Sequence, residues 1–185
     1  MRANMAKRGK AGISFILASI LIWAAISVIW LLPLPNILTK NFLTFCFAAI
    51  LVPITFALSR IVRGEFSVKD DPLNNLGLLF SLNQILYLLI AIWAFSGAPE
   101  KMVVIIAVIF GAHLLPFFWL YRSRAYLVMA IAIPILITVV GWNLIDSRLF
   151  IIPVTMFFIE IIFSFWLFLE NKRRYSVRDR IESAV

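Results

Sequence analysis

The chain has 185 residues, of which 63% are hydrophobic and only 14% are charged. A soluble domain is about half apolar and a quarter charged, so a soluble core could not hold this many apolar side chains. The net charge of +8 comes from 17 Lys and Arg residues against 9 Asp and Glu residues. This composition excludes a soluble globular protein and predicts an all-α integral membrane protein.

Six apolar segments are long enough to cross a hydrocarbon core, which takes about 20 residues as a helix. They cover residues 12–32, 41–61, 76–95, 101–121, 126–145 and 149–169. Lipid offers no partner to an unpaired backbone amide, and the alternating pattern of a membrane barrel is missing, so each segment is expected to be helical. The sequence predicts a compact six-helix bundle over residues 12–170, between a basic N-terminus at 1–11 and a basic tail at 171–185.

Basic residues are distributed unevenly between the two sides of this predicted bundle. Fourteen lie in the N-terminus, in the loops after the second and fourth segments and in the tail, whereas three lie on the opposite side. Positive residues are retained in the cytoplasm, so both termini are predicted to be cytoplasmic. The same residues predict contact with anionic lipid headgroups. They are spread over four flanking segments with no recognisable binding module, which argues against a nucleic-acid partner.

Four polar side chains interrupt the apolar segments: Asn83 and Gln84 in the third, His113 in the fourth and Glu160 in the sixth. A charged group at the bilayer centre costs about 2.5 to 3.5 kcal/mol on insertion scales, so such residues usually face the protein interior. With 1.5 Å of rise per residue, all four lie about 10 to 14 Å from the cytoplasmic ends of their helices. We therefore predict a shared polar layer. Contact between the third and fourth segments is expected because they are consecutive.

Two interpretations of this polar layer remain open. As structural residues, the four side chains would hydrogen-bond between helices, each bond contributing about 0.6 to 2 kcal/mol. As functional residues, a neutral His113 and a protonatable Glu160 would bind a proton or a small polar ligand, and Asn83 and Gln84 would orient it. Ionisable groups cost more to bury than amides. The sequence therefore favours function for His113 and Glu160, and structure for Asn83 and Gln84.

Prolines interrupt two of the segments at related places. In a division into two halves of three segments, Pro53 and Pro134 fall in the middle segment of each half. Broken helices in corresponding positions occur in inverted-repeat transporters, where they expose backbone groups near the midplane. The prolines therefore indicate a weak three-plus-three inverted repeat, with one break in each half.

Three classes of function fit these features. The leading hypothesis is proton-coupled transport of a small solute or ion through the polar layer. The alternatives are a regulatory or assembly subunit, with a second copy or another membrane protein as partner, and a lipid-modifying enzyme with His113 or Glu160 as general base. The sequence contains no metal-ligand cluster, phosphate-binding loop or nucleophile elbow. No catalytic residue, cofactor or metal is therefore predicted.

Several short motifs in the middle of the chain carry a family resemblance. They are DPLNNLG at 71–77, Asn83-Gln84, APE at 98–100, GAHLLP at 111–116, WLY at 119–121 and the stretch at 123–126. Together they resemble a family of small, uncharacterised multi-pass bacterial membrane proteins, most closely over residues 74–126. The resemblance implies a bacterial inner membrane and draws attention to Asn83, Gln84, Glu100, His113, Pro116, Trp119 and Tyr121. It implies no activity, and Glu160 is expected to lie outside the well-matched part.

Overall fold

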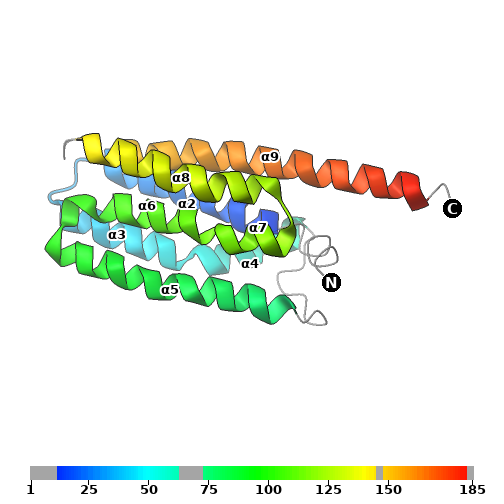
Figure 1. Ribbon diagram of the computed structural model, residues 1–185. Helices are drawn as coiled ribbons and strands as arrows, with labels where there is room; N and C mark the ends of the chain where they lie inside the picture. Colours follow the sequence, from blue (N-terminus) through cyan, green and yellow to red (C-terminus); the bar gives the residue numbers. More distant parts are fainter. Residues whose placement is uncertain (1–11, 63–72, 145–147, 183–185) are drawn as a thin grey trace.

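The computed structural model describes residues 12–62, 73–144 and 148–182, and within these residues all regular structure is helical (Figure 1). The helices are α2 (Ile13–Leu31), α3 (Ile37–Ala49), α4 (Leu51–Val62), α5 (Leu73–Gly97), the short 3-10 helix η2 (Pro99–Lys101), α6 (Met102–His113), α7 (Leu115–Tyr121), α8 (Arg124–Asn143) and α9 (Ile151–Glu182). They lie roughly parallel or antiparallel in one bundle, and α9 extends beyond the others at its C-terminal end. The predicted all-α fold is confirmed.

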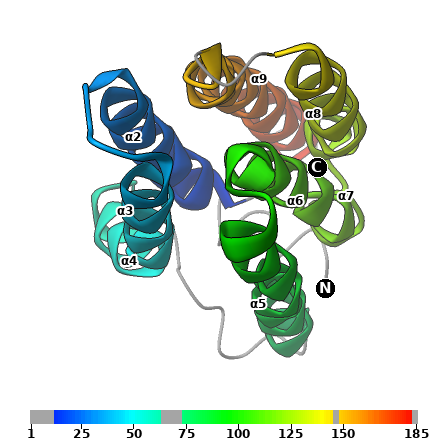
Figure 2. The ribbon, with the colours of Figure 1, turned by 90° about the vertical axis from the view of Figure 1, so that its left-hand side faces the viewer.

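The arrangement of the helices is clearest in the view along the bundle (Figure 2). Helix α6 lies between α5 on one side and α8 and α9 on the other, while α2 packs against α9 and against α3 and α4. A continuous apolar core joins α2, α6, α8 and α9. Within it, Trp23 and Phe110 make a T-shaped contact with ring centroids 6.0 Å apart, an arrangement that aromatic rings favour. This core fixes α2 and α6 relative to each other.

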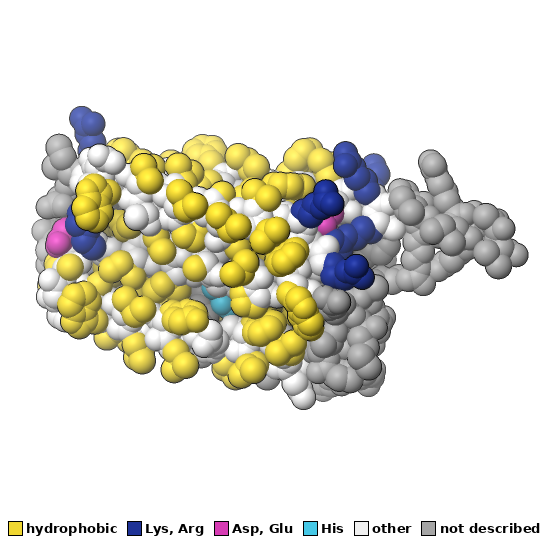
Figure 3. Space-filling model, in the orientation of Figure 1, with side chains coloured by type: hydrophobic (Ala, Val, Ile, Leu, Met, Phe, Trp, Pro, Cys, Tyr) yellow, Lys and Arg dark blue, Asp and Glu magenta, His cyan; other side chains and the backbone are white. Residues whose placement is uncertain are grey.

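Four of the described helices are long and apolar enough to cross a membrane: α2, the run from η2 to α7, α8, and α9 as far as Arg174. Helices α3 and α4 form a fifth candidate span if the bent pair counts as one. Helix α5 has 25 residues, and the apolar stretch within its fully described residues is Leu86–Gly97. Apolar side chains cover the outside between two ends where Lys and Arg gather (Figure 3). These helices indicate a membrane protein with four or five candidate spans; the sixth span and the orientation stay predictions.

Only one of the two predicted helix breaks is present. Helices α3 and α4 meet at 40° at Ile50, because Pro53 has no amide hydrogen to bond with the carbonyl of Ala49. Helix α8, by contrast, runs unbroken through Pro134, so the break predicted there is wrong. The run from η2 to α7 has a single-residue turn at Leu114, two residues before Pro116, where the backbone angles stay helical. The inverted repeat therefore loses the paired breaks that indicated it and stays a prediction.

Two helix ends extend four or more residues beyond the predicted segments. Helix α3 begins at Ile37, before the predicted start at 41, because Asn36 caps it: the Asn36 Oδ1 accepts a hydrogen bond from the Thr39 N–H at 2.7 Å. Helix α9 continues to Glu182, through most of the segment predicted as a separate tail at 171–185. Residues 171–182 of the predicted tail are therefore part of the last helix.

Helices α6 and α8 approach each other closely at two glycines. A β-carbon added at Gly111 would lie 2.6 Å from Ile133 Cγ2 and 2.8 Å from Pro134 Cδ. A β-carbon added at Gly141 would lie 2.7 Å from Val104 Cγ1. Small residues allow membrane helices to pack with their backbones close together. A larger residue at either position would have to push the two helices apart.

Candidate functional site

Glu160 on α9 is completely buried, in contact with α2. Its Oε2 lies 2.7 Å from the Oγ of Ser19, which is also buried. Its Oε1 is buried and has no hydrogen-bond partner in the part of the chain that the structure describes. The carboxyl group therefore uses only part of its hydrogen-bonding capacity inside the bundle.

The hydrogen bonds around Ser19 indicate where the carboxyl proton is. The Ser19 Oγ lies 2.7 Å from the backbone oxygen of Ile16 and also 2.7 Å from Glu160 Oε2. A hydroxyl has one proton to donate, but it can also accept. Both contacts are complete hydrogen bonds if Ser19 donates to Ile16 and a protonated Glu160 donates to Ser19. The geometry thus fits the neutral acid, which also avoids the large cost of burying an unpaired carboxylate.

His113 is the last residue of α6, next to the turn at Leu114. Its side chain is only 4% exposed, and its ring makes a T-shaped contact with Phe117 at a centroid distance of 5.2 Å. The Nε2 atom is buried and has no hydrogen-bond partner among the described residues. Figure 3 shows the imidazole, the one histidine of the chain, at the bottom of a gap between apolar side chains. One ring nitrogen therefore remains available to a ligand or a proton.

His113 and Glu160 lie at similar depths in the bundle. The ring of Phe110 on α6 contacts two rings of α2, Phe15 and Trp23, so Phe110 is roughly level with Ser19, midway between them. Ser19 in turn contacts Glu160. His113 is three residues beyond Phe110, about 4.5 Å along the helix axis. The two ionisable groups are thus about one helical turn apart in depth.

A chain of aromatic ring contacts leads from His113 to the turn of α9 next to Glu160. Contacts run from His113 to Phe117, from Phe117 to Tyr126 and from Tyr126 to Phe163, with centroid distances of 5.2, 6.2 and 5.0 Å. Phe163 is three residues from Glu160 on α9, about one turn along the helix. No hydrogen bond among the described residues joins His113 to Glu160, so the two groups are treated as separate polar sites connected by ring contacts.

Asn83 lies apart from these buried groups. Its side chain is exposed on α5, and its Nδ2 donates a hydrogen bond of 2.9 Å to the hydroxyl of Tyr87 in the next turn. The face of α5 that packs on the bundle is marked by the contact of Phe80 with Phe117. The predicted place of Asn83 in a shared polar layer is wrong. Its depth agrees with the prediction, but its side chain points away from the face of α5 that packs on the bundle.

Gln84 is level with His113 along the helix axes. The antiparallel register of α5 and the run from α6 to α7 follows from two contacts, Phe80 with Phe117 and Gly77 with Leu120. This register places position 84 opposite position 113. The side chain of Gln84 lies outside the described side chains, so its contact with His113 stays a prediction.

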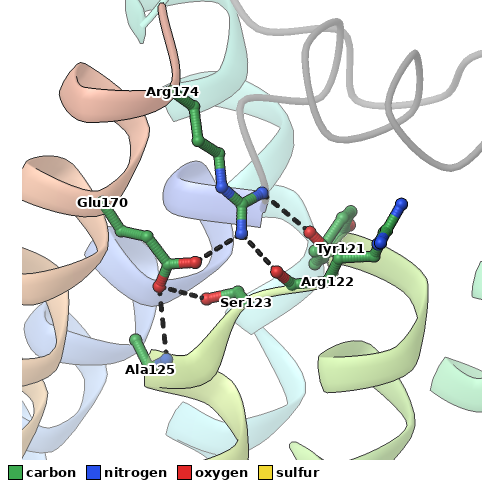
Figure 4. Close-up of polar contacts among 6 residues, drawn as sticks. All are labelled: Tyr121, Arg122, Ser123, Ala125, Glu170 and Arg174. Atoms are coloured by element: carbon green, nitrogen blue, oxygen red, sulfur yellow. Dashed lines mark hydrogen bonds and ion pairs between the residues drawn. The ribbon is translucent and has the colours of Figure 1, made fainter. Parts of the chain in front are cut away.

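A polar cluster that the sequence interpretation missed joins α7, α8 and α9 (Figure 4). Glu170 Oε2 accepts hydrogen bonds from the Ser123 hydroxyl at 2.9 Å and from the Ala125 N–H at 3.3 Å. These donors lie at the beginning of α8, where helix amides have no partner within the helix and a negative charge is stabilising. Glu170 therefore caps α8 from the side of α9.

Arg174, one turn further along α9, binds the C-terminal end of α7. It forms an ion pair with Glu170 and donates hydrogen bonds to the backbone oxygens of Tyr121, at 2.8 Å, and Arg122. These oxygens end α7, where a positive charge is stabilising. Arg122 has a φ of 51°, so the turn between α7 and α8 is left-handed at this residue. The i,i+4 spacing of Glu170 and Arg174 was the one signal in the sequence for this cluster.

Arg174→Met should lower the free energy of unfolding by about 1 to 2 kcal/mol, because two helix-terminal oxygens and Glu170 lose their charged partner. Chemical unfolding in detergent, followed by tryptophan fluorescence, measures this loss. Lys172→Met is the matched control, since Lys172 is exposed on the same helix; a change below about 0.5 kcal/mol is expected there. Equal losses in the two variants would contradict the capping role.

No group of three or more His, Cys, Asp or Glu side chains in the described ranges could hold a metal ion. In the comparisons with known proteins, a family model described as a family of unknown function, DUF7010, matches residues 1–170. No curated protein and no solved structure matches the chain. The family match confirms the resemblance to a family without an assigned function. The matched range also includes Glu160; the expectation that this residue lies outside the best-matched part stays a prediction.

Proposed function

Because the chain belongs to the family of unknown function DUF7010, which supplies no activity to carry over, we propose a function from the geometry of the buried ionisable groups. The proposed function is proton-coupled transport of a small solute or ion across the bacterial cytoplasmic membrane. In this proposal the end of the bundle that holds Glu170 and Arg174 faces the cytoplasm and its anionic headgroups. The observation that carries it is the buried Glu160 carboxyl in hydrogen-bonding geometry for a bound proton.

Unpartnered polar atoms support a functional role over a structural one. Almost all buried polar groups in proteins are hydrogen-bonded, and one that is not costs about 1 to 3 kcal/mol. Glu160 Oε1 and His113 Nε2 both carry this cost within the described structure. Residues that only hold helices together gain nothing from such atoms. A site that binds and releases a proton or a polar solute needs them, since the ligand must find unused hydrogen-bonding capacity.

Glu160 is the proton-binding group in this proposal, and Ser19 can serve both of its forms. When Glu160 is protonated, the acid can donate to the Ser19 hydroxyl, which lies 2.7 Å away, while Ser19 donates to the Ile16 oxygen. After proton loss, the same hydroxyl can turn and donate to the carboxylate, a stronger charge-assisted bond. Loading and release of the proton therefore change the bonding between α2 and α9, two helices in extensive contact. This change couples the proton to the packing of the bundle.

His113 is the proposed binding group for the solute or for a second proton. It sits at the junction of α6 and α7, where a single-residue turn at Leu114 precedes Pro116. With its Nε2 unpartnered among the described residues and its ring at the bottom of the gap in Figure 3, His113 is placed to bind a small polar molecule there.

Glu160→Gln tests the proposal directly. A glutamine amide can still donate to Ser19 but cannot release a proton, so the variant should fold normally and lose proton flux. The full chain is reconstituted in liposomes that contain a pH-sensitive dye, and small ions, amino acids and sugars are added outside in turn. At least one of them is expected to start a proton flux in the wild type that the variant lacks.

Glu100→Gln is the matched control, because Glu100 is a half-buried carboxyl in η2 at the other end of the bundle. This control should carry the wild-type flux. A folded Glu160→Gln protein with wild-type flux, or a wild type that moves protons with none of the solutes, would overturn the proposal. The second of these results would favour the alternatives, a membrane subunit or a lipid-modifying enzyme.

A further inference from the structure

Helix α5 lies at the edge of the bundle and exposes one side along most of its length (Figure 2). Its packed side faces α6, α7 and η2 and includes Ala91 and Ala94, which have no exposed surface. Its outer side exposes between 52% and 68% of four large apolar residues: Leu79, Leu86, Ile90 and Trp93. No described segment of the chain covers this outer side.

Six of the twelve exposed residues described on α5 share a heptad spacing and include the polar residue Asn83. Positions 79, 83, 86, 90, 93 and 97 are separated alternately by four and three residues, and all six are exposed. Residues with this spacing form one stripe along a helix and occupy the a and d positions of a coiled coil. Asn83, Ile90 and Gly97 take the a positions, and Leu79, Leu86 and Trp93 take the d positions. We call these six residues the α5 stripe.

We propose that the α5 stripe is the interface of a homodimer, in which the α5 helices of two copies pack in parallel. Ile at a with Leu at d favours two parallel strands, and a single Asn at an a position fixes the register. Copies that enter the membrane in the same orientation have parallel α5 helices when a two-fold axis along the membrane normal relates them. The Asn83 side chains of the two copies then meet at the same level.

Asn83 has the hydrogen-bonding groups that such a contact requires. One hydrogen of its Nδ2 is used by the Tyr87 hydroxyl. A second N–H and the carbonyl Oδ1 have no partner among the described residues, and lipid chains offer neither a donor nor an acceptor. Across a two-fold axis, the amide of each copy can donate to the Oδ1 of the other. Hydrogen bonds of this kind hold membrane helices together. The dimer would therefore satisfy the polar groups that Asn83 exposes on the outside of α5.

Cysteine cross-linking at two neighbouring positions tests the interface. Ile90→Cys and Ile92→Cys are each made in the full chain with Cys46→Ser, which removes the natural thiol. Ile90 and Ile92 are 52% and 56% exposed, but only Ile90 belongs to the α5 stripe. Mild oxidation in liposomes should convert the Ile90→Cys protein into disulfide-linked dimers and leave the Ile92→Cys protein monomeric, because a disulfide needs α-carbons within about 7 Å. Equal cross-linking at both positions, or none at either, would overturn the dimer.

Asn83→Ala tests the polar contact in the same dimer. Energy transfer between labelled copies, followed as the protein is diluted with lipid, gives the dissociation constant. The substitution should raise this constant by about tenfold, in the range expected for lost interhelical hydrogen bonds. Ile92→Ala serves as the control, since Ile92 is 56% exposed but lies outside the α5 stripe. An unchanged constant in Asn83→Ala, or an equal change in both variants, would overturn the assignment of Asn83 to the interface.

Discussion

Gly111→Ala should lower the free energy of unfolding by about 2 to 3 kcal/mol, although alanine favours helices more than glycine does. The added β-carbon would lie 2.7 Å from Ile133 Cβ and 2.8 Å from Pro134 Cδ, as well as 2.6 Å from Ile133 Cγ2. Two of these atoms belong to a proline ring and to the branch point of a side chain, so rotation of a flexible end cannot relieve the contact. Helices α6 and α8 must therefore separate.

The same substitution at Gly77 is the matched control for Gly111. A β-carbon added there would lie 3.3 Å from Leu120 Cδ2, the end of a side chain that can rotate away. Gly77→Ala should therefore change stability by less than about 1 kcal/mol, in the stabilising direction if helix propensity decides. Detergent unfolding curves of both variants make the comparison. A stability loss at Gly77 as large as the loss at Gly111 would show that close helix packing is not the cause.

Ser19→Ala and Glu160→Leu should affect stability in opposite ways. In Ser19→Ala, both oxygens of a buried carboxyl lack a partner, which should cost about 2 kcal/mol. In Glu160→Leu, Ser19 keeps its hydrogen bond to the Ile16 oxygen and the unpartnered Oε1 disappears. Replacement of a buried polar group by an apolar one of similar size is often neutral or stabilising. The double variant should therefore recover the stability that Ser19→Ala loses.

Ser27→Ala is the control for this cycle. Ser27 is also buried on α2, but its hydroxyl bonds to the Trp23 carbonyl of its own helix at 2.7 Å. Its removal should cost less than about 1 kcal/mol. Unfolding free energies of the four proteins give the coupling between Ser19 and Glu160. If Glu160→Leu lowers the free energy of unfolding as much as Ser19→Ala does, Glu160 is a structural residue. Its presence in the bundle then does not require a role in proton binding.

Hydropathy located a helix in each of the six predicted segments, because a long apolar run in lipid must satisfy its backbone within the run. It could not place the end of α9. The apolar run stops at Leu169, but Glu170 and Arg174 then bind the turn between α7 and α8, and the helix continues. Nor did the presence of a proline decide where a helix breaks. Pro134 lies within an unbroken α8, where it packs close to Gly111.

Depth along the helices was predictable for the candidate site, but rotation about the helix axes was not. His113 and Glu160 lie about one turn apart, as counting residues suggested. The same count says nothing about direction, so it could not tell that Asn83 points outward. Ser19 was missed because a serine in a membrane helix commonly bonds to its own backbone, as Ser27 does. Its position seven residues after Gly12, about 10 Å along α2, was the available signal that it shares the depth of Glu160.

Infrared spectroscopy of the protein in liposomes tests whether Glu160 carries an exchangeable proton inside the bundle. A protonated carboxyl has a carbonyl band distinct from that of a carboxylate, and the band shifts when deuterium replaces the proton. The wild type and Glu100→Gln should show such a band, which shifts in heavy water, and Glu160→Gln should lack it. The same band in Glu160→Gln, or a wild-type spectrum without it, would contradict the proposed role of Glu160.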